Sequence, residues 1–314
     1  MIIKKVTVGV PVYNEEKTIL KSLYAIHRAI LSTKLPIELI ICINGTTDHS
    51  ETIARTFSNK IYPLKIIRSK KGKAKAVKAL GTAAKGDIVI FTDADAILAE
   101  DCLKKLIEGF SDSEIKAVTG RPVPLPLDNV IYQIINARML HPEAEIARTP
   151  ILGNSKKPFL HGRLYAVRKD IFRHNKDIDT MDNSIGDDTY LTHYLFVKYG
   201  RKAIKCVEEA HTYYLPVQSI RFWWYKWSRI WCDLDQLYRE NPHFLRIKPT
   251  MKTKIDWKYV SKLPLKIKCF FVLERILHHS GHVLYEISKH FKKVTWVRLS
   301  DTKEVNQWIS KNGL

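Results

Sequence analysis

The sequence predicts an α/β protein in which a mostly parallel sheet is covered by helices, followed by a helical C-terminal part rich in aromatic and basic residues. Two observations carry this prediction. Over the first hundred residues, short β-rich apolar runs alternate with stretches whose apolar residues recur at helical spacing. In addition, polar motifs follow directly after the apolar runs, at what would be the carboxyl ends of parallel strands, where such sheets bind ligands.

The first hundred residues supply the elements of that sheet in order. Residues 6–12 form a β-rich run, and residues 37–43 are a continuous apolar run typical of a strand buried on both faces. The stretch between them carries apolar residues on one face of a helix, and Asn14 is placed to cap that helix. In chain order, the predicted strands and helices cover residues 6–12, 15–31, 37–43, 48–57, 64–67, 73–84 and 88–91.

The pattern becomes mixed after Ala117. We predict a strand over residues 162–168, a helix that begins at Asp187 or Asp188, and a strand over residues 203–207. A Pro-rich turn, a helical stretch and an irregular polar segment precede them, over residues 121–128, 129–140 and 141–157.

Composition and cysteine usage indicate a folded protein of a reducing compartment. The chain has 314 residues, which is long enough to bury a full core. Of these residues 45% are hydrophobic and 27% are charged, as is usual for a folded protein. Its five cysteines are scattered without a C-x-x-C pair, which argues against a disulfide framework or a zinc site. The N-terminus does not resemble a signal peptide, and no window reaches the roughly 18 apolar residues of a membrane span. We therefore expect a cytoplasmic protein.

The net charge of +20 needs a cause. From Arg201 to the end, 22 Lys and Arg residues stand against 10 Asp and Glu residues, so +12 falls in the last third. An anionic membrane surface, a solvated lysine-rich exterior and nucleic acid each account for such a charge. Of these three explanations we favour the membrane surface, which predicts a peripheral position at the inner face of the cell membrane. The sequence contains no nucleic-acid recognition motif that we can identify, so we expect no nucleic-acid partner.

Asp93-Ala94-Asp95 directly follows the fourth predicted strand. Two carboxylates at i and i+2, where the chain turns at a strand end, can converge on one hard divalent cation. Such a cation keeps open positions for substrate phosphates. A D-x-D triplet alone is a weak signal that also fits helix capping, but its place after a buried strand favours a metal site.

Four motifs, in this order and spacing, resemble the nucleotide-binding half of family 2 glycosyltransferases. They are Pro11-Val12-Tyr13-Asn14-Glu15, Asn44-Gly45-Thr46-Thr47-Asp48, Gly72-Lys73 and Asp93-Ala94-Asp95. The resemblance implies a GT-A fold, a Rossmann-like sheet flanked by helices. It also implies a catalytic domain of residues 1–215, with a nucleotide-binding half (1–100) and an acceptor half (101–215), and a C-terminal extension of residues 216–314 that faces acceptor or membrane.

The resemblance assigns roles to the residues of these motifs. The nucleoside would be approached by Pro11, Tyr13, Asn14 and Glu15, and the base would lie beside the loop from Asn44 to Asp48. Lys73 would lie near the nucleotide, while Asp93, Ala94 and Asp95 would serve the ribose and a Mg²⁺ or Mn²⁺ ion. From the residues alone, Asn44-Gly45 also fits a plain turn and Lys73 a solvated helix face.

One departure from the family pattern concerns the base. The family commonly has two acidic residues where this chain has Ile43-Asn44. Because Ile43 cannot accept a hydrogen bond from a uracil imide, a UDP-linked donor is less secure, and both UDP- and GDP-linked sugars stay open.

Asp187-Asp188 forms a second acidic site. It resembles the family's Glu-Asp pair at the start of a helix, with Asp187 where Glu is more usual. In inverting members the second carboxylate is the general base that deprotonates the acceptor hydroxyl, and this role would belong to Asp188. A positioned base contributes about 10²–10⁴-fold to the rate. A helix N-cap is the alternative, and Asp187 can cap while Asp188 reacts.

Two histidine positions are weaker candidates. His161-Gly162 aligns with a segment that in relatives lies near the donor sugar or the acceptor, and Gly162 would let substrate approach the backbone. His211 stands where some GT-A enzymes recruit a third metal ligand. Isolated histidines are more often ordinary surface or core residues.

The C-terminal part is aromatic and basic. On a helix, Trp223, Trp227 and Trp231 would form one stripe flanked by cations. Gln218-Ser219-Ile220-Arg221-Phe222 is close to the Gln-x-x-Arg-Trp motif of relatives that act on polymers or lipids, with Phe222 in the Trp position. This register makes Gln218, Arg221 and Trp223 acceptor candidates, and a second register around Arg229 stays open. An interfacial helix and a core stripe are the alternatives. Residues 265–287 and 289–299 repeat the basic amphipathic pattern.

The sequence thus favours an enzyme: an inverting, divalent-metal-dependent transferase that moves a hexosyl or N-acetylhexosaminyl group from a nucleotide-diphosphate sugar to a hydroxyl of a glycan or lipid-linked acceptor. A retaining GT-A transferase acting on a small acceptor such as a glycerate would share the donor half without needing Asp188 as a base. A basic membrane- or polyanion-binding protein is the non-enzymatic alternative.

Overall fold

The computed structural model describes residues 3–147, 159–173, 175–184, 186–251 and 253–289, which form two compact units. Unit 1 comprises residues 3–122 and 159–214, and unit 2 comprises residues 123–147 and 215–289. The larger segment of unit 2 begins at Leu215, next to residue 216, where the sequence predicts that the C-terminal extension begins. Unit 2 also includes residues 123–147, which that division assigns to the acceptor half.

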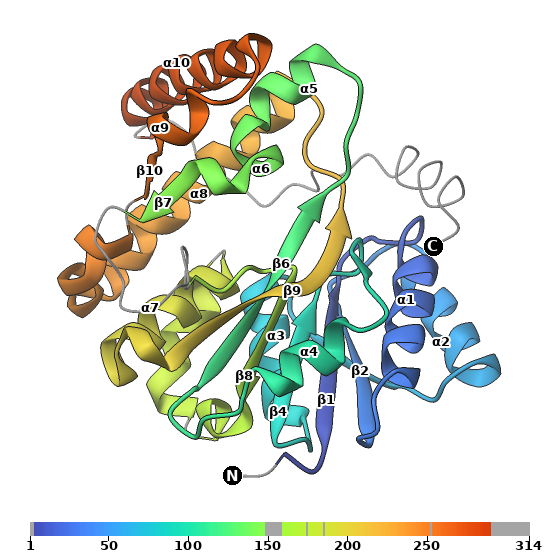
Figure 1. Ribbon diagram of the computed structural model, residues 1–314. Coiled ribbons are helices and arrows are strands. Elements are labelled where there is room, and N and C mark those ends of the chain that lie inside the picture. The colour runs from blue at the N-terminus through green and yellow to red at the C-terminus, as the bar shows by residue number, and fades with distance from the viewer. Residues whose placement is uncertain (1–2, 148–158, 174, 185, 252, 290–314) are drawn as a thin grey trace. The chain divides into compact units, whose positions relative to one another are not determined.

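Unit 1 is built on an eight-stranded sheet with the strand order β3-β2-β1-β4-β8-β6-β9-β5 (Figure 1). Its strands are β1 (Val6–Val12), β2 (Ile37–Asn44), β3 (Lys65–Ser69), β4 (Ile88–Thr92), β5 (Ile97–Leu98), β6 (Ala117–Pro124), β8 (Leu164–Arg168) and β9 (Ile204–Tyr214). Strands β1 to β4 pair in parallel, whereas β8 runs antiparallel to both β4 and β6. The sheet is therefore parallel through the nucleotide-binding motifs and mixed beyond them.

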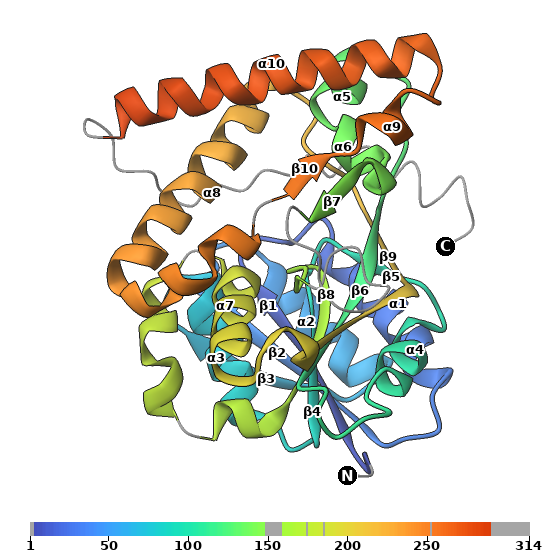
Figure 2. The ribbon, with the colours of Figure 1, turned by 60° about the vertical axis from the view of Figure 1, so that its left-hand side comes forward.

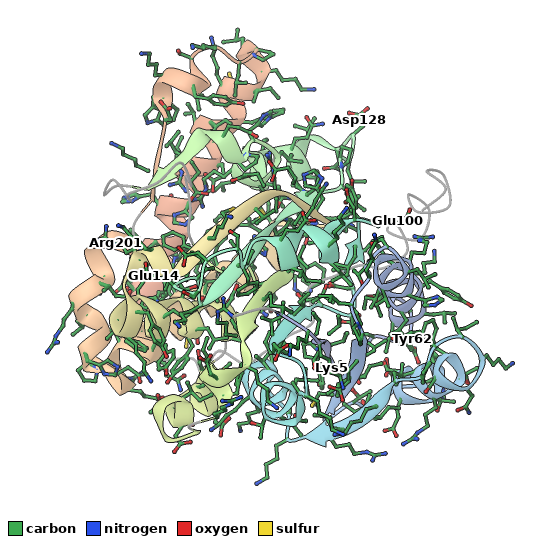
Figure 3. All side chains as sticks on the ribbon, turned by 60° about the horizontal axis from the view of Figure 1, so that its bottom comes forward. Lys5, Tyr62, Glu100, Glu114, Asp128 and Arg201 are labelled. Carbon is green, nitrogen blue, oxygen red and sulfur yellow. The ribbon has the colours of Figure 1, made fainter. Side chains whose placement is uncertain are left out.

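Helices cover both faces of this sheet. They are α1 (Ile19–Leu31), α2 (Ser50–Lys60), α3 (Lys73–Ala83), α4 (Cys102–Glu108) and α7 (Asp187–Tyr199), with short turns η2 (Lys169–Phe172), η3 (Asn175–Asn183) and η4 (Arg201–Ala203). Apolar residues of α1, α2 and α4 share one core with alternate residues of β1 and β2. On the other face α3 and α7 lie side by side (Figure 2). Exposed charged side chains such as Glu100 and Glu114 lie outside these layers (Figure 3).

Gly9 of β1 shows how closely α3 approaches the sheet. A Cβ atom at this position would lie 3.3 Å from the Phe91 ring and 3.4 Å from Leu80 of α3. A glycine here therefore lets α3 pack directly on the strand. The close packing holds α3, whose first residue is Lys73, against the sheet.

The predicted elements of the first hundred residues are present, with shifted boundaries. The prediction that Asn14 caps the first helix is wrong: α1 begins at Ile19, and Asn14 has a left-handed backbone with a φ of 55°. Its side-chain oxygen accepts hydrogen bonds from Thr47 instead. The alternative that Asp187 caps its helix is also wrong, because Gly186 is the N-cap residue of α7.

Unit 2 is mainly helical. It contains α5 (Val130–Ile135), α6 (Ala137–Leu140), η1 (Pro142–Ala144), β7 (Glu145–Ala147), α8 (Ile220–Glu240), η5 (Pro242–Met251), β10 (Thr253–Ile255), α9 (Trp257–Val260) and α10 (Leu265–Ser288). Helices α8 and α10 pack closely at Gly281, where a Cβ atom would lie 3.3 Å from the Trp223 ring. The basic amphipathic segment of residues 289–299 lies, apart from Lys289, outside the described residues. Among the described helices, none has the length and apolar character that crossing a membrane requires.

Candidate active site

The polar loops of unit 1 gather at one edge of the sheet. Because β1 pairs in parallel with both β2 and β4, the carboxyl ends of these strands lie on the same side. Tyr13 follows β1, Asn44 ends β2 and Asp93 follows β4. This is the edge at which open α/β sheets bind their ligands.

The loops after β1 and β2 are hydrogen-bonded to each other. The side-chain oxygen of Asn14 accepts the backbone N–H of Thr47 at 2.8 Å. The Asp48 carboxylate accepts the backbone N–H of Glu16 at 3.0 Å and that of Ser50 at 3.0 Å. Asn14 and Asp48, two of the predicted nucleotide-binding residues, thus hold the two loops in place.

The other predicted nucleoside contacts lie along the same loops. The Lys71 ammonium lies 4.5 Å from the centre of the Tyr13 ring. Asn44 is buried, and the chain turns after it at Gly45 with a φ of 78°. Pro11 is the penultimate residue of β1, and the Glu15 carboxylate accepts the Thr18 hydroxyl at 2.6 Å.

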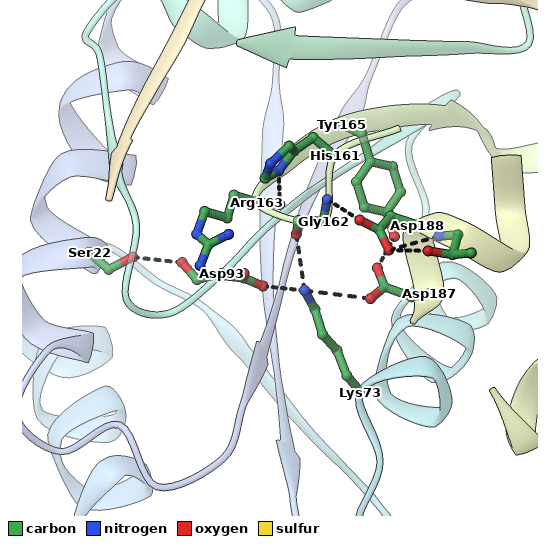
Figure 4. Close-up of polar contacts among 10 residues, drawn as sticks. Ser22, Lys73, Asp93, His161, Gly162, Arg163, Tyr165, Asp187 and Asp188 are labelled. Atoms are coloured by element: carbon green, nitrogen blue, oxygen red, sulfur yellow. Dashed lines mark hydrogen bonds and ion pairs between the residues drawn. The ribbon is translucent and has the colours of Figure 1, made fainter. Parts of the chain in front are cut away.

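Lys73, the first residue of α3, links the donor and acceptor halves of unit 1 (Figure 4). Its Nζ lies 2.6 Å from Asp93 Oδ1 and 3.5 Å from Asp187 Oδ1, and it donates to the Gly162 carbonyl at 3.1 Å. Burial lowers the pKa of Lys73, but Asp187, Asp93 and Asp188 together raise it above its ordinary value. Lys73 is therefore a fixed cation among carboxylates, not a solvated lysine on a helix face.

Asp187 is the buried member of the acidic pair. It is 1% exposed, and its Oδ2 accepts the Tyr165 hydroxyl at 2.5 Å. Burial raises the pKa of Asp187 to about 6, with Lys73 acting in the opposite direction and Asp188 adding to the rise. With both oxygens occupied inside the protein, Asp187 orients Lys73 and Tyr165.

Asp188 is the accessible member of the pair. Its Oδ2 accepts the backbone N–H of Gly162 at 2.7 Å, and its Oδ1 accepts the backbone N–H of Thr189 at 2.7 Å. Oδ1 also accepts the Thr189 hydroxyl at 3.4 Å. These bonds fix the carboxylate and leave a lone pair on Oδ2. A Cβ atom on Gly162 would lie 3.0 Å from Asp188 Oδ2 and 3.0 Å from Lys73 Nζ, so a larger residue would have to displace these two side chains.

Arg163 supplies the second cation of the site. Its guanidinium carbon lies 4.0 Å from the centre of the Tyr214 ring. Burial lowers the pKa of Arg163, but Asp95, followed by Tyr214, Asp93 and Asp188, raises it above its ordinary value. The backbone N–H of His161 donates to the Thr119 hydroxyl oxygen at 3.1 Å, and the His161 ring lies 6.3 Å from the Tyr214 ring.

The chemistry of this cluster fits a divalent cation. Four carboxylates face two cations, which leaves a formal charge of −2 on the six side chains: Asp93, Asp95, Asp187, Asp188, Lys73 and Arg163. Ala94 is buried in the core between the first two of these carboxylates. Mg²⁺ is commonly held by one or two carboxylates together with substrate phosphates and water, so two aspartates suffice.

His211 is not joined to the aspartates in a three-ligand group. Among the described residues, no three His, Cys, Asp or Glu side chains come together in that way. In β9 the side chains of Thr212 and Tyr214 are buried while that of His211 is half-buried, and its backbone carbonyl accepts the N–H of Ala99. Strand alternation thus places His211 on the opposite face from Thr212.

The three acceptor candidates of the C-terminal extension belong to unit 2. Trp223 is 2% exposed and packs in a core with Ile135 and Val217, so its indole is not presented as a stacking platform, and the core-stripe interpretation describes it. Arg221 lies on α8 with its guanidinium carbon 5.9 Å from the Tyr225 ring. Gln218 precedes α8, and its buried Nε2 has no hydrogen-bond partner within the described residues.

Sequence reasoning missed two residues of unit 1 that shape the site. Tyr165, the second residue of β8, bonds Asp187, and Arg163, which directly precedes β8, interacts electrostatically with Asp95. Both stand in an apolar, strand-like stretch whose periodicity says nothing about a partner far along the chain. The only local signal is that Gly162 directly precedes them.

Comparisons with known proteins identify the family of this chain. Residues 7–175, more than half of the chain, match glycosyl transferase family 2. The chain is 33% identical over 93 residues to the O-antigen chain rhamnosyltransferase WbaN of Salmonella anatum, covering 29% of each protein. It is 31% identical over 121 residues to a dolichol-phosphate mannosyltransferase of Pyrococcus furiosus, covering 38% of this chain and 34% of that protein. The chain thus spans about a third of the length of these relatives.

A solved structure shows the same fold. Mannosyltransferase PcManGT from Pyrobaculum calidifontis, in complex with GDP-Man and Mn²⁺, aligns with a TM-score of 0.52 at 16% identity, covering 100% of this chain and 80% of that chain. The predicted GT-A fold is confirmed. The match over residues 7–175 spans the strand-end motifs and Gly162. The chain therefore belongs to glycosyl transferase family 2.

Proposed function

We propose that this protein is an inverting glycosyltransferase that moves a sugar from a UDP- or GDP-linked donor to a hydroxyl of a glycan or lipid-linked acceptor. The observation that carries the proposal is the position of Asp188. Its carboxylate is fixed by two backbone N–H groups and lies within the cluster that contains Lys73 and Asp93. A base is thus held beside the residues expected to bind the donor.

In the proposed mechanism, Asp188 removes the proton of the acceptor hydroxyl as that oxygen attacks the anomeric carbon. An alcohol becomes a good nucleophile only as its proton leaves, so the base must be oriented before the reaction. The Gly162 and Thr189 N–H groups supply this orientation. Asp187 is too buried to meet an acceptor and instead positions Lys73.

Donor binding belongs to the loops after β1, β2 and β4. Tyr13 and Asn44 would contact the nucleoside, and Asp93 and Asp95 would hold the Mg²⁺ or Mn²⁺ ion. When bound, this ion would neutralise negative charge on the departing diphosphate. Lys73 and Arg163 add positive charge at the same place and would steady the phosphates.

The first experiment measures thermal stabilisation by nucleoside diphosphates, each with and without Mn²⁺. A ligand that binds the native state raises the melting temperature, so selective, Mn²⁺-dependent stabilisation by UDP or GDP would identify the donor class. Asp93→Ala should abolish the Mn²⁺-dependent part. Asp101→Ala, at a side chain that is 53% exposed and pairs with Lys105, is the matched control and should keep it. An unchanged shift in Asp93→Ala would remove the metal site from the proposal.

The second experiment tests the base. Asp188→Asn should bind donor normally but lose at least about 100-fold in turnover, in line with the usual contribution of a positioned base. Wild-type turnover in this variant, or a product that retains the donor's anomeric configuration by NMR, would contradict the inverting mechanism and favour the retaining alternative. Salt-sensitive binding to polyanions without any nucleotide effect would favour the non-enzymatic alternative.

The cytoplasmic location stays a prediction.

A further inference from the structure

Helix α10 of unit 2 has one buried and one exposed face, and large apolar side chains line the exposed face. Phe271, Glu274 and Tyr285 are buried on the inner face. On the outer face seven large apolar side chains are between 44% and 75% exposed: Leu265, Val272, Leu273, Ile276, Val283, Leu284 and Ile287. We call these seven residues the α10 apolar face. At about 100° per residue they fall within an arc of roughly 120°.

The α10 apolar face is long and almost free of charge. Its helix has 24 residues, which corresponds to about 36 Å. The other exposed positions within the arc are the uncharged Cys269 and Ser280, and Lys266 stands at its edge. Isolated exposed apolar residues need no explanation, but a continuous row of this length marks an interaction surface.

Basic residues gather at the amino end of this face. Between residues 254 and 268 the chain has five lysines against one acidic residue, Asp256. Lys258, Lys262 and Lys266 are exposed, and Trp257 beside them is 50% exposed. Exposed tryptophan next to lysine is typical of segments that lie at the headgroup level of a membrane.

The acidic residues of α10 do not cancel this charge. Glu274 is 1% exposed and pairs with Arg138 and Arg275, so it does not reach the surface. Glu286 pairs with Lys289 at 2.6 Å. The exposed charge around the α10 apolar face is therefore positive.

From these observations we infer that α10 docks on the surface of an anionic lipid bilayer. The α10 apolar face would enter the boundary between headgroups and acyl chains, and the lysines at its amino end would meet the lipid phosphates. The α10 apolar face belongs to a single helix, so its row of side chains can enter a deformable bilayer. None of the described helices qualifies as a membrane span, so the helix would lie in the plane of the membrane. This inference goes beyond the proposed glycosyl transfer and does not depend on it.

The test is flotation of the full chain with phosphatidylcholine vesicles, with and without phosphatidylglycerol. The wild-type protein should float with the anionic vesicles and bind neutral ones at least about tenfold more weakly. Ile276→Glu combined with Val283→Glu should lower binding to anionic vesicles at least about tenfold, because two inserted side chains become charged. Lys258→Gln combined with Lys262→Gln should reduce the preference for anionic lipid and leave neutral binding unchanged.

The matched control is Leu20→Glu combined with Leu31→Glu on α1, two apolar residues that are 42% and 69% exposed. This variant carries the same change of charge and should float like the wild-type protein. Equal flotation of the α10 and α1 variants would overturn the inference. The inference would also be overturned if the wild-type protein did not bind vesicles and light scattering showed a dimer that the α10 variant does not form. A second copy of the chain would then cover the α10 apolar face. Mn²⁺-dependent nucleotide stabilisation, measured without vesicles, should be the same in all variants, and its absence would count only against the proposed function.

Discussion

Replacing Lys73 with methionine removes the cation that lies between the acidic residues of the site. The ammonium is 2.6 Å from Asp93 and 3.5 Å from Asp187, and its side chain is 20% exposed. At an effective dielectric constant of about 20, these separations correspond to attractions of roughly 6 and roughly 5 kcal/mol. Removal of the charges from water offsets most of this attraction, and losing one partner of a buried pair typically costs about 3–5 kcal/mol.

We expect a loss near the lower end, about 3 kcal/mol, because Asp93 is 21% exposed and can be solvated by water. Urea unfolding followed by circular dichroism should report this loss as a fall of about 1–2 M in the midpoint. Lys75→Met on the same helix is the control, since Lys75 has no ion pair within the described part of the chain. An equal loss in both variants would refute the reasoning, because the effect would then belong to the helix and not to the carboxylates.

The same variant separates structural from ligand-binding roles. Without Lys73, Asp93 no longer has a cation at 2.6 Å, so Mn²⁺ alone should bind more tightly. A nucleoside diphosphate should bind more weakly, because one positive charge beside the phosphates is lost. Isothermal titration calorimetry measures both. Parallel weakening of Mn²⁺ and nucleotide would show that the variant disturbs the site as a whole.

Three further predictions concern the neighbours of Lys73. The pKa of Asp187 is raised to about 6, so the folded state binds the proton of this carboxyl more tightly than the unfolded state does. The stability that the protonated carboxyl contributes is fully present below about pH 4 and is lost as the pH rises through about 6. Asp187→Asn should therefore gain stability relative to wild type between about pH 4 and pH 7 in urea unfolding, and the opposite trend would contradict a carboxyl whose burial outweighs Lys73. Tyr165→Phe removes a hydroxyl that donates to Asp187 at 2.5 Å, and it should lower the free energy of unfolding by about 2 kcal/mol in the same assay at pH 8. A loss below about 0.5 kcal/mol would contradict a charge-assisted hydrogen bond. Gly162→Ala should displace Asp188, 3.0 Å from the new Cβ, and lower turnover about 100-fold while donor binding persists; unchanged turnover would mean that the carboxylate moves aside without consequence.

Much of the sheet could be predicted because its signals are local. Apolar runs and helical spacing predict β1, β2, β4 and their helices to within a few residues. The start of α1 could not be predicted, since it depends on a contact 33 residues away. Asn14 looks like a helix cap when only its neighbours are considered. In the structure the Asn14 side chain accepts a hydrogen bond from the Thr47 N–H, and the Asn14 backbone has a left-handed conformation that a helix cannot contain. The helix therefore begins only at Ile19.

The site was predictable only as far as its motifs reach. Asp93, Asp187 and Asp188 could be predicted because their short motifs follow a predicted strand or open a predicted helix and resemble the acidic motifs of the family. Their connections were not predictable. Lys73 meets a carbonyl 89 residues along the chain, and Tyr165 meets a carboxylate 22 residues away, through packing that no periodicity encodes.

The adjacent carboxylates at the start of α7 explain how one dipeptide can serve two purposes. Consecutive helical residues point about 100° apart, so Asp187 and Asp188 cannot share an environment. The first is turned into the protein toward Tyr165 and Lys73, and the second toward the Gly162 N–H. Lys73 also donates to the carbonyl of Gly162, so Gly162, which precedes β8, connects Asp188 to the cation that pairs directly with Asp187. Asp188 and Lys73 are thus both bonded to Gly162, and Lys73 is in turn paired with Asp187, so the four residues form one connected group.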